Sequence, residues 1–312
     1  MTPTAPELGS GAEGRQIAVV SSLLGLPVPT IRSWERRYGF PVPPRTGGRH
    51  RRYTDLEIEQ LRGVRDLITK GHSTKEAVEK VRTGLSAGGA MQDALGEFAA
   101  AALTHDPDAL RAVLERSADQ VGVEVAIRDV LLPGMNRIGS AWKAGSCDVA
   151  TEHLATGAVR SWLARQAAMA PPPFRPHPVV LSCGPKDLHT IGLEAFAVLL
   201  ARRGWPCRVL GAMTPAQAVV TATASSGAAA VVVVSQRAVT RRAAIESLHA
   251  TSRLGGVKTF YAGDAFATPA ARQTAPGTYL GSDILVAVDV LEAEVGSDSS
   301  GRRRVRAGSR PV

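Results

Sequence analysis

Asp187 and His189 form the pair in this chain best suited to metal chemistry. A neutral imidazole can bind a metal ion through one ring nitrogen, while a carboxylate accepts the proton of the other nitrogen and fixes the tautomer. Gly192, three residues after the histidine, would let a bulky planar group approach the backbone. Taken alone, the motif fits equally well an ordinary loop histidine that follows a helix-capping aspartate.

The elements around this pair predict where it lies. The apolar run at residues 179–184 is typical of a buried parallel strand, and residues 193–200 are typical of a helix. The pair would then lie on a loop at the carboxyl end of a strand, where open α/β sheets bind ligands. Three more strands are predicted, and they end near Thr214, Ser235 and Gly263.

The order of these signals resembles the cobalamin-binding domain of methionine synthase and of the adenosylcobalamin mutases. The resemblance implies a Rossmann-like (flavodoxin-like) α/β domain over residues 176–295, with His189 as the lower axial cobalt ligand. It also implies further cofactor contacts from Asp187, Gly192, Thr214, Ser235 and Gly263. Two positions depart from the pattern: Arg237 stands where the family has leucine in Ser-x-Leu, and Ala262 replaces the first glycine of a Gly-Gly pair.

Length and composition point to a soluble globular protein. A chain of 312 residues, 44% of them hydrophobic, has room for two or three domains. No run approaches the roughly 20 apolar residues of a membrane span, and the first thirty residues lack the features of a signal peptide. The cysteines, Cys147, Cys183 and Cys207, lack metal-ligand spacing, which fits a reducing cytoplasm.

The net charge of +9 is concentrated at the two ends of the chain. Residues 1–85 carry 14 basic and 9 acidic side chains, a net +5, and residues 297–312 carry five arginines and one aspartate, a net +4. This distribution predicts a nucleic-acid-binding head and a basic tail. The tail, residues 296–312, and the first 14 residues are predicted to be disordered. The tail is either a weak DNA contact or only a solvated end, and the second reading is favoured.

Residues 17–39 predict a helix-turn-helix. A short apolar helix is followed by the turn Gly25-Leu26-Pro27 and by a helix that carries basic residues. Ile31 and Trp34 would face inward, whereas Arg32 and Arg36, four positions apart, would face outward together.

The string Trp34–Gly39, with Arg45-Thr46 and Arg51-Arg52-Tyr53, resembles the winged helix-turn-helix of MerR-family transcription regulators over residues 15–83. The resemblance implies binding to a double-stranded DNA operator. The candidate contacts are Arg32, Arg36, Arg37, Tyr38, Arg45, Arg49, His50, Arg51 and Tyr53. Members of that family usually continue into a coiled coil that dimerises, but the glycines of residues 84–90 predict a linker, so dimerisation would come from elsewhere.

Residues 91–170 are predicted to form a four-helix bundle, with helices near residues 91–103, 107–121, 123–139 and 149–169. Residues 138–145 and 151–153 resemble the light-responsive adenosylcobalamin repressors of the MerR family. The resemblance implies that Trp142, Glu152 and His153 cover the upper face of the corrin. The alternative is a core tryptophan and a solvated helix start.

Lys143 departs from the pattern of these photoreceptors, which carry a histidine directly after the tryptophan. In them, that histidine captures cobalt after photolysis, and an ammonium group has no free lone pair with which to do so. A light state with two histidine ligands is therefore in doubt for this chain.

The sequence thus predicts a multidomain α and α/β protein with no catalytic residues. Its predicted function is that of a repressor whose oligomer, a dimer to a tetramer, binds its operator under the control of adenosylcobalamin and light. The resemblance implies carotenoid genes among its targets. Two alternatives remain: a cobalamin-independent regulator that keeps the fold, which Lys143, Ala262 and Arg237 favour, and a carrier subunit of an enzyme, against which the DNA-binding head argues.

Overall fold

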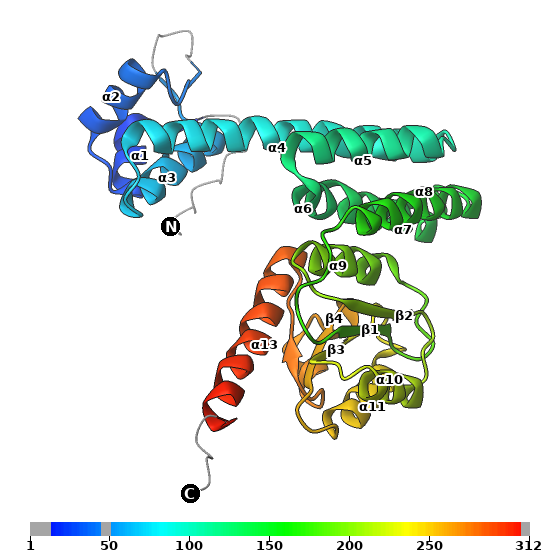
Figure 1. The fold of residues 1–312 in the computed structure, drawn as a ribbon. Coiled ribbons are helices and arrows are strands. Elements are labelled where there is room, and N and C mark those ends of the chain that lie inside the picture. Colours follow the sequence, from blue (N-terminus) through cyan, green and yellow to red (C-terminus); the bar gives the residue numbers. More distant parts are fainter. Residues whose placement is uncertain (1–13, 45–50, 307–312) are drawn as a thin grey trace, which may run out of the picture. The chain divides into compact units, whose positions relative to one another are not determined.

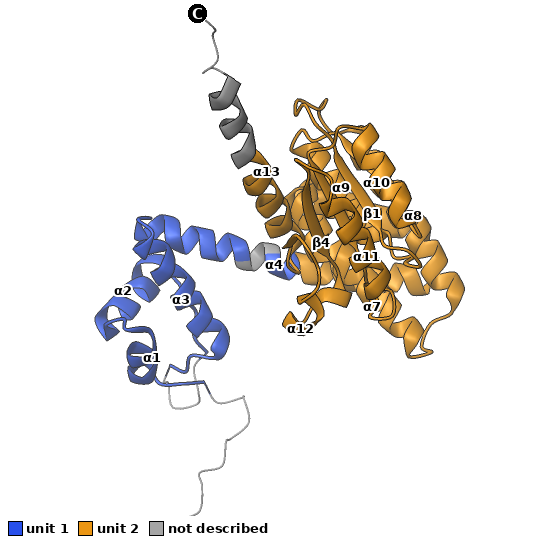
Figure 2. Cartoon of the chain, turned by 90° about the horizontal axis from the view of Figure 1, so that it is seen from below, with its two compact units in different colours: residues 1–90 blue, residues 91–312 orange. Residues whose placement is uncertain are grey.

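The computed structural model describes residues 14–44 and 51–306, apart from the side chains of residues 85–87 and 297–306. The chain divides into two compact units, residues 1–90 and residues 91–312, which are described separately below (Figure 2). The expected combination of a helical head, a helical bundle and a parallel α/β domain is confirmed. Of the predicted disordered start, residues 1–14, all but Gly14 lie outside the described residues.

The first unit is helical. It contains α1 (Ile17–Leu24), α2 (Val28–Tyr38), α3 (Asp55–Thr69) and the beginning of α4 (Thr74–Leu103). Both α1 and α2 end at a glycine in the left-handed region, Gly25 at φ 64° and Gly39 at φ 60°, where a side chain would be strained. A capping box between Thr54 and Glu57 begins α3.

The core of this unit follows the predicted inward-facing positions. Ile31 and Trp34 of α2 are buried together with Val20 and Leu24 of α1. Arg15, before α1, and Tyr53, before α3, form an antiparallel bridge with N–O distances of 2.7 and 2.9 Å, and the Tyr53 side chain is part of this core. The packing of α2 against α1 therefore fixes which of its residues remain exposed.

The boundary between the two units falls after Ala90, at the end of the predicted linker, residues 84–90. The predicted break in the chain there is wrong, because α4 is one helix of 30 residues from Thr74 to Leu103. Gly84, Gly88 and Gly89 each weaken a helix by about 1 kcal/mol relative to alanine. Propagation adds one hydrogen bond per residue, and buried apolar residues on both sides, such as Val78 and Met91, stabilise the two ends. The division between the units falls inside this helix.

The second unit begins with the bundle. After α4 come α5 (Pro107–Val121), α6 (Val123–Ala126), the π-helix η1 (Ile127–Leu131), α7 (Leu132–Lys143) and α8 (Val149–Ala168). The third predicted helix is thus a continuous run of α6, η1 and α7. Helix α8 packs against α5 and α7 on one side and against α9 of the α/β domain on the other.

The α/β domain contains a five-stranded parallel sheet in the order β2-β1-β3-β4-β5. Its strands are β1 (Val179–Cys183), β2 (Cys207–Gly211), β3 (Ala230–Val234), β4 (Lys258–Ala262) and β5 (Thr278–Tyr279). Four of them match predicted strands, whereas the two-residue β5 is too short to leave a sequence pattern. The strand order reverses between β1 and β3, which is where doubly wound sheets bind ligands.

Helices cover both faces of this sheet (Figure 1). They are α9 (Ile191–Arg202), α10 (Ala216–Ser225), α11 (Arg241–Ser252) and α13 (Ile284–Arg306). The short 3-10 helix η2 (Asp264–Phe266) and α12 (Pro269–Arg272) follow β4. Helices α9 and α13 pack on one face, and α10 and α11 pack on the other. The carboxyl ends of the strands therefore remain open for a ligand.

Helix α13 also corrects the predicted tail. It continues through residues 296–306, which were predicted to be disordered, because a helix that begins on a packed face can extend by one hydrogen bond per residue. The last six residues of the tail, 307–312, lie outside the described residues. Among the described residues, no single helix is long and apolar enough to cross a membrane, although α1 and α2 pass that test as a pair bent by 106°.

Candidate cofactor site and DNA-binding surface

Asp187 holds His189 from inside the protein. The Asp187 carboxylate is buried, and its Oδ1 accepts hydrogen bonds from the backbone N of His189 at 3.0 Å and from the ring Nδ1 at 2.8 Å. The imidazole itself is 54% exposed. The carboxylate therefore selects the tautomer that carries its proton on Nδ1 and leaves the lone pair on Nε2.

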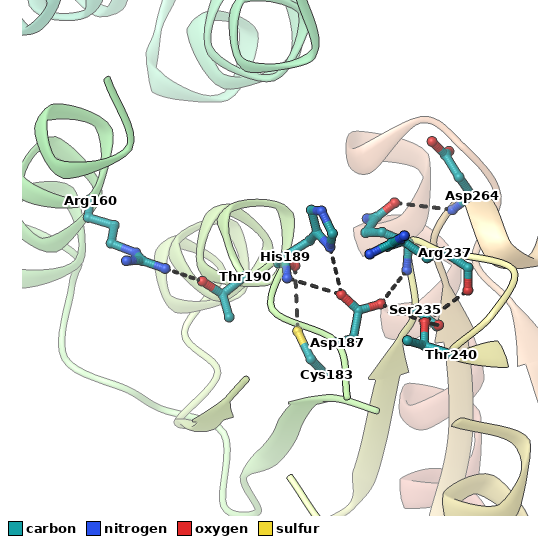
Figure 3. A network of polar contacts seen from close by, with 10 residues as sticks. Arg160, Cys183, Asp187, His189, Thr190, Ser235, Arg237, Thr240 and Asp264 are labelled. Carbon is teal, nitrogen blue, oxygen red and sulfur yellow. Dashed lines mark hydrogen bonds and ion pairs between the residues drawn. The ribbon is translucent and has the colours of Figure 1, made fainter. Parts of the chain in front are cut away.

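The second oxygen of Asp187 ties this loop to the end of β3 (Figure 3). Oδ2 accepts hydrogen bonds from the backbone N of Gln236 at 2.7 Å and from the Thr240 hydroxyl at 3.2 Å. The buried Ser235 hydroxyl lies 2.7 Å from that of Thr240, so Ser235 reaches Asp187 only through Thr240. Gln236 and Thr240 were not among the predicted site residues, since nothing local in the sequence pairs them with Asp187.

These donors set the charge of the site. Burial alone would raise the pKa of the Asp187 carboxyl, but hydrogen bonds from the backbone of Gln236 and from His189 outweigh burial and hold the pKa below its ordinary value. The carboxylate is therefore ionised at neutral pH. A buried, ionised acceptor increases the basicity of the imidazole that it holds.

The Nε2 atom of His189 can form one bond to a metal ion. Among the described residues, Nε2 has no hydrogen-bond partner, and no group of three or more His, Cys, Asp or Glu side chains could hold a metal ion. A metal at His189 must therefore bring its other ligands with it, as the cobalt of a corrin does. The residues present thus fit a cobalamin with His189 as its axial ligand.

Exposed apolar side chains surround this histidine at the same edge of the sheet. Leu188, Met213 and Val239 come from the loops after β1, β2 and β3, and their exposed fractions are 64%, 56% and 77%. The Met213 N donates to the Asp187 carbonyl at 2.9 Å, which joins two of these loops. Solvent-exposed apolar side chains next to an imidazole with an unpaired nitrogen are suited to binding a large, flat and partly apolar ligand. The sequence analysis did not single out these three residues.

The other residues predicted to contact the cofactor from the α/β domain, Gly192, Thr214 and Gly263, have different roles. A Cβ on Gly263, at φ 103°, would lie 2.2 Å from the Ser235 carbonyl oxygen, so only glycine fits there. A Cβ on Gly192 would have no neighbour closer than 4.0 Å, so that space is open to a ligand. The buried Thr214 hydroxyl donates to the Gly211 carbonyl within its own turn, at 3.2 Å.

Cys183, at the end of β1, lies directly behind the histidine. Its thiol donates to the His189 carbonyl at 3.5 Å, and it is fully buried. Burial, reinforced by the nearby Asp187 carboxylate, raises the pKa of this thiol to about 12. The protonated sulfur is therefore not a competing metal ligand at neutral pH.

The predicted upper-side residues lie on the bundle. Trp142 lies in the last turn of α7 with half of its surface exposed, and Glu152 and His153 lie near the start of α8. The His153 Nε2 lies 3.5 Å from the Glu152 Oε2, and Glu152 also accepts the Thr156 hydroxyl at 2.8 Å. Of the alternative, a core tryptophan and a solvated helix start, the first half is wrong, because Trp142 is half exposed. The second half agrees with the structure, because the His153 side chain is exposed near the start of α8. Lys143, directly after Trp142, is exposed.

The outward face of α2 is the candidate DNA-binding surface. Arg32, Arg36 and Arg37 are exposed, and none of them forms an ion pair with another described residue. A hollow beside them is lined by Pro29, Thr30, Ser33, Trp34, Arg37, Tyr38 and Thr74. Hydroxyl and guanidinium donors in such a hollow suit phosphate oxygens, and free arginines suit base edges.

Two of the wing residues hold the head together. Tyr53 is fully buried, and its hydroxyl donates to Glu35, so the prediction that it contacts DNA is wrong. Burial of the phenol, with the hydrogen bond to Glu35, raises the Tyr53 pKa. The Arg51 Nε lies 2.9 Å from the same carboxylate, which neutralises part of its charge. The predicted contacts Arg45, Arg49 and His50 lie outside the described residues.

Comparison with known families matches two separate parts of the chain. Residues 15–83 match the family described as MerR HTH family regulatory protein. Residues 94–165, which form most of the bundle, match the family described as B12 binding domain. The head thus matches the family that its motifs resemble, and the bundle matches a family of B12-binding domains.

Comparisons with individual proteins cover about two thirds of the chain. The HTH-type transcriptional repressor CarA of Myxococcus xanthus is 35% identical over 209 residues, which are 65% of this chain and 70% of CarA. The repressor CarH of the same organism is 31% identical over 216 residues, 65% of this chain and 72% of CarH. A monomethylamine corrinoid protein of Methanosarcina barkeri shares the fold of 64% of this chain and 97% of its own, at a TM-score of 0.52 and 14% identity.

Proposed function

The chain belongs to the family of HTH-type transcriptional repressors that includes CarA and CarH, and from this premise we propose that it is a repressor controlled by adenosylcobalamin. The observation that carries the proposal is the free Nε2 of His189, held by a buried carboxylate beside exposed apolar side chains. His189 would bind cobalt from below, and Trp142, Glu152 and His153 would contact the adenosyl group from above. The protein would act in the cytoplasm as a regulator and not as an enzyme.

The regulatory step is a change in assembly. Bound cofactor would favour an oligomer, a dimer to a tetramer, because its contacts with the bundle and with the α/β domain hold these parts in one arrangement. Several heads on one oligomer raise operator affinity through effective concentration. Bound adenosylcobalamin supplies a cobalt–carbon bond that light can break. Loss of the adenosyl contacts would then loosen the oligomer and relieve repression, with carotenoid genes among the targets.

The test is light scattering coupled to size-exclusion chromatography, with corrin absorbance recorded on the same column. The protein is loaded with adenosylcobalamin in the dark and is run before and after green light, with hydroxocobalamin as the matched control ligand. We expect a dark oligomer that carries corrin and dissociates on illumination. A protein that binds no corrin would contradict the proposal and favour the cobalamin-independent regulator.

The DNA-binding surface has a test of its own. Replacement of Arg36 by alanine should weaken operator binding by about 1–3 kcal/mol if this arginine meets a base edge. Arg116→Ala is the matched control, since it removes an equal charge from α5, where Arg116 pairs with Glu97. Operator binding is measured by fluorescence anisotropy at fixed salt, because phosphate contacts depend on salt. Equal affinity of both variants would remove Arg36 from the interface.

A further inference from the structure

Arg160 of α8 reaches the residue that directly follows His189. Its Nη2 donates to the Thr190 hydroxyl at 2.7 Å (Figure 3). Its Nε donates to the Glu194 Oε1 at 3.2 Å. The Thr190 hydroxyl donates in turn to the same Glu194 oxygen at 2.6 Å. One guanidinium therefore ties the bundle to the first turn of α9.

Thr190 uses its hydroxyl in an unusual way for its position. It is the residue before α9, where a threonine side chain commonly accepts a hydrogen bond from the backbone of the first turn. Here it makes no such cap, and the buried hydroxyl bonds to Arg160 and Glu194 instead. The position of the residue next to His189 thus depends on a side chain from another helix.

The same face of α8 also carries a residue of the upper side. His153 and Arg160 are seven positions apart, which is close to two turns of an α-helix, so they lie on one face. A shift of α8 relative to α9 would therefore move His153 and, at the same time, strain the hydrogen bond between Arg160 and Thr190.

We propose that Arg160 is a positioning residue: through Thr190 and Glu194, it holds the His189 loop in the geometry that presents Nε2 to cobalt, and it couples that loop to the α8 face that carries His153. This inference rests on the proposed cobalamin function. A guanidinium is suited to this role because its planar fork can bond to a hydroxyl and a carboxylate at once.

The first experiment needs no cofactor. Hydrogen–deuterium exchange of residues 187–193 is compared in wild type, Arg160→Met and Arg165→Met. Arg165 is a matched control, because it lies on the same helix and pairs at 3.1 Å with Glu115 inside the bundle. We expect exchange in this segment to be about tenfold faster in Arg160→Met alone. Wild-type exchange in Arg160→Met, or equal acceleration in Arg165→Met, would overturn the positioning role.

The second experiment measures coupling to the ligand. Arg160→Met should raise the Kd for adenosylcobalamin about tenfold, within the usual range of coupling between sites. Arg160→Lys, which keeps a cation near Glu194, should recover part of the affinity. Thr190→Val provides a second route if Arg160→Met fails to fold, because it removes the hydroxyl without changing the charge. It should weaken binding in the same direction, and wild-type affinity in Thr190→Val would contradict the role.

A double-mutant cycle shows through which residue Arg160 acts. In a His189→Ala background, Arg160→Met should cause no further loss of affinity, because the group that it positions is gone. Fully additive losses would show that Arg160 acts elsewhere and would overturn the inference. If wild type binds no corrin, the proposed function fails, and the exchange experiment alone then decides whether Arg160 holds the loop.

Discussion

The two sides proposed to enclose the cofactor are built differently. On the lower side, the buried Asp187 accepts hydrogen bonds from His189, Gln236 and Thr240, which come from two loops. On the upper side, Trp142 is half exposed, and among the described residues Glu152 bonds only within the first turns of its own helix. The lower side is therefore organised before a ligand arrives, whereas the upper side gains most of its contacts from the ligand. The affinity for cobalamin should depend mainly on the lower side, and discrimination between upper ligands of the cofactor should depend mainly on the upper side.

The largest effect is expected from His189→Ala. The variant should lose cobalamin affinity by about 100-fold or more, because a direct ligand should matter more than the 10–100-fold typical of its supporting partners. Affinity is measured by absorbance titration of the corrin. His249→Ala, which removes an exposed histidine of α11 that bonds to the Thr274 carbonyl, is the control and should bind as wild type does. Unchanged affinity in His189→Ala would end the axial-ligand assignment.

A smaller but broader effect is expected from Asp187→Asn. Cobalamin affinity should fall about 10–100-fold, because the imidazole loses its charged acceptor. The free energy of unfolding should fall by about 1–3 kcal/mol, since an amide cannot accept all the buried hydrogen bonds. Titration and chemical denaturation test both effects. Asp264→Asn is the control, because Asp264 joins the network only through its backbone N. Wild-type stability in Asp187→Asn would contradict the view that the lower side is organised in advance.

The pH dependence of the free energy of unfolding also tests whether the Asp187 carboxylate organises the lower side in advance. The pKa of Asp187 is lower in the folded protein than its ordinary value. Its contribution is therefore fully present above the unfolded-state pKa, near 3.9, and is lost as the pH falls through the folded-state value. Wild type should lose stability in acid more steeply than Asp187→Asn, as measured by denaturant midpoints at a series of pH values. Parallel profiles would show that the carboxylate is not stabilised by folding.

On the upper side, Trp142→Ala should act selectively. We expect about a tenfold loss of affinity for adenosylcobalamin and little change for hydroxocobalamin, because the half-exposed ring has apolar surface for a large upper ligand to cover. Isothermal titration with both cofactors makes the comparison. Phe174→Ala, which removes an exposed ring outside the bundle, should leave both affinities unchanged. Equal losses for the two cofactors would place Trp142 outside the upper-ligand contact.

The smallest effect in the dark is expected from Lys143→His. Dark affinity should stay within about twofold of wild type, because Lys143 is exposed and its ammonium cannot bind cobalt. After illumination, the variant should show a persistent corrin spectrum that wild type lacks. Lys143→Gln controls for the loss of charge. Identical illuminated spectra in wild type and Lys143→His would show that Lys143 does not limit capture.

Local sequence patterns predict the individual helices and strands, but they do not predict contacts between residues far apart in the chain. The spacing of apolar residues places α1 and α2, whereas unbroken apolar runs place the buried strands, as in β1 and β3, where all five residues are buried. Gln236 and Thr240 donate hydrogen bonds to Asp187 from 49 and 53 positions further along the chain, respectively. No local sequence pattern predicts these bonds. Tyr53 lies in a basic string, yet the fold places its ring in the core. The glycines of α4 suggest a break that packing on both sides overrides.

The buried thiol of Cys183 has one more consequence. Because it lies behind His189, is fully buried and has a pKa of about 12, it can react with an alkylating reagent only when the surrounding loop opens. Its labelling rate is thus a direct record of how often the histidine loop leaves its folded position. A ligand that binds at His189 should slow that labelling in proportion to the occupied fraction, without any spectroscopic signal from the ligand itself.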